Sequence, residues 1–319
     1  MSSHIVILLF VLTSINSFAQ KGDLKGYVIE GDEVVFTFNR DDYSKVTHDG
    51  TGRQSDFEDL DIQNVVVAGN FNDWSKDQWK MTKIDENTYQ LRKKLSDFAD
   101  EFSWEFKYVI NNELWAEPSR TYLNQGSAAK IGRRLQSYNL RLFTAFPDKK
   151  GNVRFRLRGF EDAKKVIVSG TFNRWNEELF RMYKIENGWE IILQLRPNEY
   201  EYRFIVDGHW MEDPTNPDKV VNEFGEYNSH INVKKQVTFS LQGFADAKEV
   251  VLAGSFNDWN EHDFQMQKND YGVWTYSLPL SGGKHHYKFI VDGNWIVDPD
   301  NTVQEYDGIG HINSVYMVK

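Results

Sequence analysis

The amino-acid sequence predicts an all-β protein built from three tandem immunoglobulin-like antiparallel β-sandwiches. The phrase Phe-Asn-x-Trp occurs three times, and each time it follows an apolar run that ends in glycine. Around each copy, short apolar–polar alternations are broken by Gly, Asn and Asp, which is typical of antiparallel strands. A repeat with this strand pattern favours a row of sandwiches over one large domain.

Composition narrows the classes of function. The chain has 319 residues, of which 40% are hydrophobic and 15% aromatic, enough for two or three domains. Its formal net charge of −10 argues against a nucleic-acid partner and is compatible with a neutral ligand such as a sugar. The absence of cysteine excludes a disulfide scaffold, a thiolate metal site and a cysteine nucleophile. No cofactor or metal is expected.

The N-terminus has the pattern of an export signal. Residues 5–12 are apolar, and Ser17 and Ala19 are small residues suited to cleavage after position 19. The apolar run is too short to span a bilayer, and no other segment approaches that length. Residues 1–19 are therefore predicted to be a signal peptide, with the product in the periplasm or outside the cell. The alternative is a disordered or buried N-terminal strand.

The repeats divide the remaining chain at residues 20–147, 148–235 and 236–319. The second and third copies align almost without gaps, and their loop tryptophans, Trp175 and Trp259, are 84 positions apart. The first copy has an inserted polar stretch at residues 39–58. The joins at residues 147–151 and 234–236 are short, which favours a fairly stiff rod.

A hairpin in each of the last two copies is the clearest local signal. In the third copy, Asp292 and Gly293 separate two alternating apolar segments, a strong signal for a two-residue turn. With that turn, Ile290 pairs with Trp295, and Lys288 shares their face because strand side chains alternate. The second copy repeats the arrangement with Asp207, Gly208, Arg203, Ile205 and Trp210.

A basic residue beside an indole ring, both outside the core, suits a sugar-binding surface. The apolar C–H face of a pyranose can lie on the ring while the cation donates hydrogen bonds to hydroxyl groups. The alternative is a cation–π pair that only covers the face of the sheet.

Taken together, these motifs resemble a known family. Gly-x-Phe-Asn-x-Trp, then Tyr-Lys/Arg-Phe-Ile-Val-Asp-Gly-x-Trp, Asp-Pro and a late strand with asparagine are similar to the family-48 carbohydrate-binding module. This is the glycogen-binding domain of the AMP-activated protein kinase β subunit, isoamylases and branching enzymes. The resemblance is strong over residues 150–235 and 236–319 and partial over 30–145. It implies early-set immunoglobulin-like sandwiches that bind α-1,4-linked glucans.

The resemblance also implies which residues contact the sugar. In the third copy they are Trp259, Lys288, Trp295, Ile309, His311 and Asn313, and in the second copy Trp175, Arg203, Trp210, Phe224, Glu226 and Asn228. In the first copy only Trp74, Lys107 and Trp115 can be placed. Glu226 and His311 stand where the family has threonine, and the first copy has a longer turn at residues 111–114. The loop phenylalanines and asparagines of the repeated phrase are expected to be structural.

These observations favour an exported, non-catalytic, multivalent α-glucan-binding protein. Its partners would be an α-glucan polysaccharide or oligosaccharide and, in one version, a glycoside hydrolase that it supplies with glucan. Enzymes that carry this module add a catalytic barrel, for which the three sandwiches leave no residues here. Two alternatives stay open: an adaptor that recognises another protein, and an accessory subunit that regulates a glucan-processing enzyme.

Overall fold

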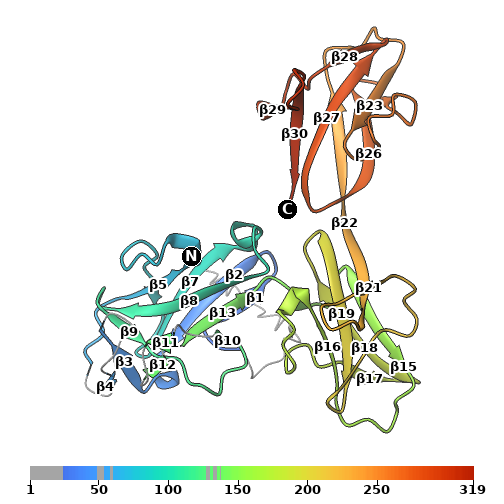
Figure 1. The fold of residues 1–319 in the computed structure, drawn as a ribbon. Coiled ribbons are helices and arrows are strands. Elements are labelled where there is room, and N and C mark those ends of the chain that lie inside the picture. The colour runs from blue at the N-terminus through green and yellow to red at the C-terminus, as the bar shows by residue number, and fades with distance from the viewer. Residues whose placement is uncertain (1–23, 49–53, 58–59, 127–129, 132–134, 137) are drawn as a thin grey trace, which may run out of the picture.

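The computed structural model describes residues 24–48, 54–57, 60–126, 130–131, 135–136 and 138–319. Within these residues the chain is nearly all β-strand, with short 3-10 helical turns, and it forms three sandwiches that each enclose a hydrophobic core (Figure 1). The predicted all-β fold class is confirmed. The predicted signal peptide, residues 1–19, lies outside the described residues. No described helix is long and apolar enough to cross a membrane.

The first sandwich contains the elements up to β13. Their bounds are β1 (Tyr27–Glu30), β2 (Glu33–Asn39), η1 (Arg40–Asp42), β3 (Lys45–Thr47), β4 (Gln54–Asp56), β5 (Val65–Gly69), η2 (Asn70–Asn72), β6 (Thr82–Lys83), β7 (Thr88–Lys94), η3 (Leu95–Phe98), β8 (Ser103–Ile110), β9 (Leu114–Ala116), β10 (Gln125–Gly126), β11 (Lys130–Ile131), β12 (Leu135–Gln136) and β13 (Asn139–Phe143). One sheet has the order β1-β2-β7-β6, and the other has the order β10-β13-β8-β9-β3-β4 with β5 also paired to β8.

The second and third sandwiches share one topology. The second is built from β14 (Phe146–Pro147), β15 (Val153–Arg158), β16 (Val166–Gly170), η4 (Thr171–Asn173), β17 (Tyr183–Ile185), β18 (Gly188–Gln194), β19 (Asn198–Val206), β20 (His209–Met211), β21 (Lys219–Val221) and the first half of β22 (Tyr227–Leu241). The third is built from the second half of β22, β23 (Val250–Gly254), β24 (Phe264–Gln265), β25 (Gln267–Lys268), β26 (Trp274–Ser281), β27 (Gly283–Val291), β28 (Asn294–Ile296), β29 (Gln304–Tyr306) and β30 (Ile312–Val318). In both, a sheet with a central long strand (β19 or β27) lies against a smaller sheet.

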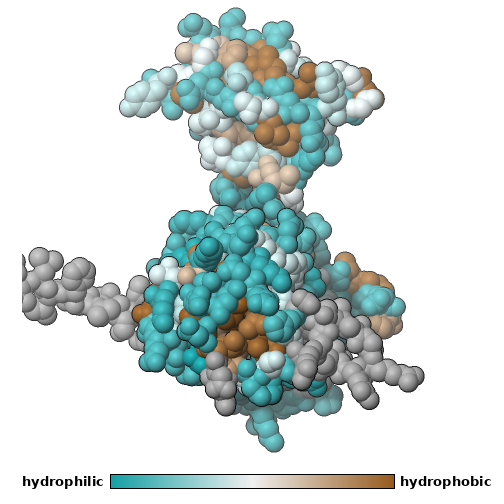
Figure 2. Space-filling view, turned by 90° about the vertical axis from the view of Figure 1, so that its left-hand side faces the viewer, coloured by the Kyte–Doolittle hydropathy of each residue, from teal (hydrophilic) through white to brown (hydrophobic). Residues whose placement is uncertain are grey.

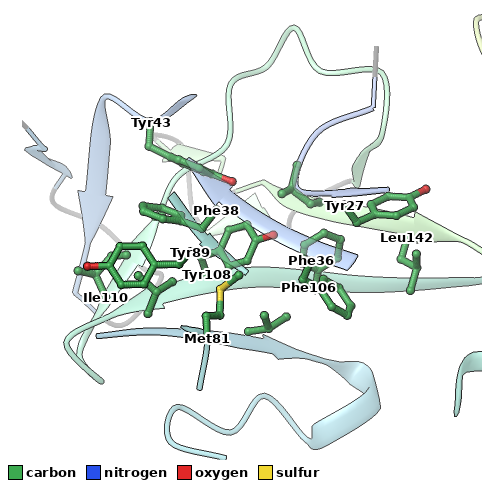
Figure 3. Packing of buried hydrophobic residues seen from close by; sticks show 14 of the residues in the cluster. Tyr27, Phe36, Phe38, Tyr43, Met81, Tyr89, Phe106, Tyr108, Ile110 and Leu142 are labelled. Atoms are coloured by element: carbon green, nitrogen blue, oxygen red, sulfur yellow. The ribbon is translucent and has the colours of Figure 1, made fainter. Parts of the chain in front are cut away.

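Alternation along the strands places aromatic side chains in the cores. In the first sandwich, Phe36 and Phe38 of β2 point inward and meet Phe106 and Tyr108 of β8 across the sandwich (Figure 3). Ring centroids are 5.2 Å apart for Phe36 and Phe106 and 5.4 Å apart for Phe38 and Tyr108, both edge to face. This is the period-two pattern of a half-buried strand.

One strand, β22, belongs to two sandwiches. It pairs with β19 up to Val233 and with β26 from Lys234 onward, so no linker residue separates the two ladders. Val233 packs into the core of the second sandwich, while Val237 and Phe239 pack into the core of the third. The join that the sequence predicts to be stiff is thus a continuous strand.

The first sandwich lies beside the second and does not extend it into a rod (Figure 1). Strand β14, at the predicted end of the first copy, pairs with β18 of the second sandwich. The guanidinium of Arg196 lies 4.3 Å from the ring centroid of Phe102, whose ring also contacts Tyr200 at 5.5 Å. Because Lys319 forms a 2.6 Å ion pair with Asp100, the third sandwich also contacts the first.

A buried polar network explains the Asp-Pro motif. In the third sandwich the Tyr287 hydroxyl donates to Asp298 at 2.6 Å, and the Asp298 N–H donates to Ser314 at 2.8 Å. The second sandwich repeats these bonds with Tyr202, Asp213 and Ser229. The network ties the segment after each hairpin to the last strand, and so it fixes the position of the hairpin.

We predict that Asp298→Ala lowers the free energy of unfolding of the third sandwich by about 1.5–3 kcal/mol, because the buried Tyr287 hydroxyl loses a charged acceptor. Urea unfolding followed by tryptophan fluorescence measures the change. Asp300→Ala, two residues away and exposed, is the control and should change stability by less than about 0.5 kcal/mol. Equal effects of the two variants would contradict the structural role of Asp298.

Candidate functional site

The repeated Phe-Asn-x-Trp phrase forms the same loop in all three sandwiches. Its asparagine side chain accepts a hydrogen bond from the preceding glycine N–H, at 3.0 Å for Asn173 and 2.9 Å for Asn72 and Asn257. A side chain on Gly170 would lie 2.3 Å from the carbonyl oxygen of Glu201, so only glycine fits there. As the sequence predicts, the asparagine caps the turn and Phe172 packs in the core.

Each loop tryptophan has an unusual backbone conformation. Trp175 and the residue before it have φ values of 57° and 54°, in the left-handed region, and the other two copies repeat this pair. The backbone N–H of the tryptophan donates to the carbonyl oxygen of the glycine that precedes the phrase, at 2.9 Å for Trp74 and Trp175 and 3.0 Å for Trp259. The loop therefore turns the indole back over the outer face of the sheet.

The hairpin supplies a second tryptophan to this face. Ile290 pairs with Trp295, and Ile205 pairs with Trp210, so the predicted register is confirmed in both sandwiches. The indole centroids of Trp259 and Trp295 are 6.3 Å apart at an interplanar angle of 47°, and those of Trp175 and Trp210 are 6.0 Å apart at 53°. Two residues distant in sequence thus form one aromatic platform, whose geometry is repeated.

The platform of the third sandwich is open. Trp295 is 42% exposed, and Trp259 packs on the small apolar patch of Val251, Ala253 and Ile290. Lys288 shares the face of Ile290 and is half-buried. The tryptophans therefore have support beneath them and solvent in front of them.

The loop between β29 and β30 contains two more residues that the resemblance assigns to sugar contact, Ile309 and His311. Ile309 at its tip is 80% exposed. The side chain of Asp307 accepts hydrogen bonds from the N–H groups of Ile309 and His311, and these bonds hold the pKa of Asp307 below its usual value. Its other oxygen lies 3.0 Å from the His311 ring. Asn313, in the adjoining strand, is buried.

The second sandwich has the same loop with different polar contacts. Phe224 at the tip is 80% exposed, and its backbone N–H donates a hydrogen bond to the side-chain oxygen of Asn222 at 3.0 Å. Asn228 is buried and donates to Glu201 at 2.8 Å. Glu226, which occupies the position that His311 has in the third sandwich, forms an ion pair with Arg203. The basic residue of the second site is therefore partly neutralised within the protein.

The first sandwich has the same pair of tryptophans, but its hairpin tryptophan, Trp115, is buried. Strand β3, from the inserted stretch, pairs with β9 and places Thr47 opposite Trp115, which is only 9% exposed. The Lys76 ammonium lies 5.2 Å from the centroid of the Trp115 ring. Trp74 still lies 6.1 Å from Trp115.

Lys107 of the first sandwich is buried as well. Its ammonium donates to Glu117 at 2.7 Å, and the Thr47 hydroxyl donates to the same carboxylate oxygen at 2.7 Å. The side chains of Lys107 and Glu117 are only 3% and 5% exposed. The residue that corresponds to Lys288 is thus part of an internal ion pair.

Sequence reasoning missed several residues that shape these sites. Asn222 and Asp307 occupy equivalent positions, 85 apart, at the start of matching loops, so the repeat itself could have revealed them. Glu117 and Thr47 carry no comparable signal, because their contact with Lys107 depends on how the inserted strand pairs.

The open platforms suit a flat, uncharged, polyhydroxylated ligand. Indole faces offer apolar contact, and Lys288 or Arg203 offers N–H donors at the rim. In the space-filling view, apolar side chains gather in small patches on a mostly hydrophilic surface, including the upper part formed by the third sandwich (Figure 2). Within the described residues, no group of three His, Asp or Glu side chains is arranged to hold a metal ion.

Comparison with known proteins agrees with this geometry. A family model described as the glycogen recognition site of AMP-activated protein kinase matches residues 152–240 and 237–319, more than half of the chain. The chain belongs to this family. The two matches coincide with the two sandwiches whose hairpin tryptophan, Trp210 or Trp295, is not buried, and we call them the second and third glycogen recognition modules. The first sandwich lies outside both matches.

Relatives share the module and not the whole chain. The mouse AMP-activated protein kinase subunit β-2 is 39% identical over 79 residues, which is 25% of this chain and 28% of the relative. The pig β-1 subunit is 39% identical over 72 residues, 23% of this chain and 57% of the relative. Among solved structures, the pullulanase from Anoxybacillus sp. LM18-11 aligns with a TM-score of 0.22 and 13% identity, over 54% of this chain and 26% of that one.

We predict that Glu117→Gln lowers the free energy of unfolding of the first sandwich by about 3–5 kcal/mol at neutral pH, because it removes the negative charge that balances the buried ammonium of Lys107. The same change at Glu226, the exposed partner of Arg203, is the matched control and should cost less than about 1 kcal/mol. Urea unfolding of the wild type, Glu117→Gln and Glu226→Gln measures the two losses of stability.

The loss of stability caused by Glu117→Gln should become smaller as the pH rises. Burial lowers the pKa of Lys107, and Glu117 opposes that shift, so the substitution lowers this pKa further. A folded-state pKa below the unfolded value means that the folded protein binds fewer protons, and stability then rises with pH. The difference from wild type should therefore narrow towards pH about 10, near the pKa of unfolded lysine. A constant difference between pH 7 and 10 would contradict a buried charge as its cause.

Proposed function

We propose that this protein is a non-catalytic, exported α-glucan-binding protein that binds through its second and third modules. The repeated tryptophan pair carries the proposal. In each module two indoles lie on the outer face beside a basic residue, with ring centroids 6.0 Å apart in the second module and 6.3 Å apart in the third. Membership of the glycogen recognition family supports a glucan as the ligand class.

The chemistry of the platform favours a sugar over a protein ligand. The two rings of each pair are inclined by about 50° (53° and 47°), so they form a shallow, angled surface. Successive glucose units of a curved chain can each lay a C–H face on one ring. Phe224 and Ile309 offer further exposed apolar surface at their loop tips, and the cation beside each pair can donate hydrogen bonds to hydroxyl groups.

The first sandwich is, in this proposal, a third and diverged copy of the module that does not bind glucan. Its sheet order around β5, β8, β9 and β13 corresponds to that around β16, β19, β20 and β22 in the second module. The inserted strand β3 covers Trp115, and Lys107 is committed to Glu117. Its contribution is then structural, through the contacts that it makes with the second module.

Catalysis is absent from the proposed function. Two acidic residues on the side of Arg203 are engaged: Glu226 pairs with Arg203, and Glu201 accepts from Asn228. Glycoside hydrolysis needs a carboxylic acid and a second carboxylate on opposite sides of the scissile bond. Export rests on the pattern of residues 1–19, and delivery of bound glucan to a glycoside hydrolase is its proposed use.

We predict that the double variant Trp175→Ala with Trp259→Ala loses retention on insoluble starch, whereas the wild type is retained. Each tryptophan lies at the centre of its platform, so each change should cost on the order of 2 kcal/mol, about a thirtyfold loss of affinity at that module. Titration calorimetry with maltoheptaose measures the loss, and cellohexaose tests the preference for α-linkages.

Tyr271→Ala provides the matched control. Tyr271 is 92% exposed and belongs to the turn between β25 and β26, in the sheet opposite the platform. Its removal should leave starch retention unchanged. Circular dichroism establishes that the tryptophan variants remain folded. Absence of starch retention by the wild type would refute the proposed function.

A further inference from the structure

The two glycogen recognition modules meet head to head. The turns that precede the equivalent strands β19 and β27 both lie at the junction. A side chain on Gly282 would come within 2.0 Å of the Pro197 carbonyl oxygen, and Asn232 donates to the Ser281 hydroxyl at 3.0 Å. Both hairpin strands therefore begin at the same place.

From this junction the equivalent strands run in opposite directions. Strand β22 is antiparallel to β19 in the second module and antiparallel to β26 in the third. Strand β26 ends at the junction, where Ser281 pairs with Lys234, and β27 then runs away from the second module, along the direction of β22 (Figure 1). The hairpin turns at Asp207 and Asp292 thus lie at opposite ends of the pair.

This reversal fixes how the two platforms are related. A rotation that turns a strand direction into its opposite is a half-turn about an axis perpendicular to the strand. If the axis is perpendicular to the plane of the platform, both platforms face the same side of the molecule, but a chain bound to one runs in the opposite direction to a chain bound to the other. If the axis lies otherwise, the platforms face different sides.

A glucan chain has a direction, from its non-reducing to its reducing end. Two equivalent sites related by the half-turn cannot both bind consecutive stretches of a chain that keeps one direction and one face along the pair, because either the direction or the face is wrong for one of them. The junction cannot swivel to correct this, since Val233 pairs with β19 and the next residue, Lys234, already pairs with β26.

We propose that the second and third modules bind two separate α-glucan chains, or two arms of one branched molecule, and hold them together. The protein is then a cross-linker of α-glucan and not a clamp on a single chain. This inference rests on the proposed function of the two platforms.

Light scattering of the full chain mixed with soluble glycogen tests the inference. The wild type should raise the scattering as it joins particles, and the effect should fall again at excess protein, when each particle is saturated. Trp175→Ala and Trp259→Ala should each still bind glycogen through the remaining platform but should give no increase over glycogen alone. Scattering by either single variant at the wild-type level would overturn cross-linking by the pair.

Calorimetry with a long linear maltodextrin gives an independent measure. Two chains should bind per protein, each with an affinity similar to that of maltoheptaose. One chain per protein with an affinity raised by orders of magnitude would show a clamp and overturn the proposal. Retention on starch without cross-linking would refute this inference alone, whereas no retention would refute the proposed function with it. Trp210→Ala and Trp295→Ala replace the first pair of variants if either fails to fold.

Discussion

The strict alternation of side chains along β22 is the constraint on which the arrangement of the two recognition modules depends. Its inward-facing residues serve one core up to Val233 and another from Val237. A slip of one residue in the register would turn polar side chains into both cores at once. The two modules are therefore coupled by the same backbone ladder that stabilises each of them, and their relative direction is part of the fold.

The first sandwich has a similar loop but a different surface beside it. Its loop retains the glycine, asparagine and left-handed tryptophan of the other copies. The difference arises at the edge of the sheet, where β3 adds to β9. Once an added strand desolvates Lys107, the charge needs a partner inside the protein, and Glu117 with Thr47 meets that need. In the first sandwich the covered edge therefore goes together with an internal ion pair, whereas Lys288 of the third sandwich is only half-buried.

Local sequence signals were sufficient for much of the fold and of the candidate site. The Asp-Gly turn determines the hairpin register, and the register alone brings Trp295 opposite Ile290. The arrangement of the sandwiches was not predictable in this way. The packing of Arg196 on Phe102, and the pairing of β14 with β18, join residues that no turn or periodicity relates. The covering of Trp115 depends on a similar non-local pairing by an insertion without strong strand character.

The left-handed backbone at the loop tryptophans has a consequence for recognition. A non-glycine residue in this conformation costs about 1–2 kcal/mol, and each loop contains two such residues in succession. The glycine carbonyl and the capping asparagine compensate for this cost when the protein folds. The indole then stands preorganised, so an arriving ligand does not have to order the loop. Weak contacts to a shallow surface can for this reason retain most of their gross energy as affinity.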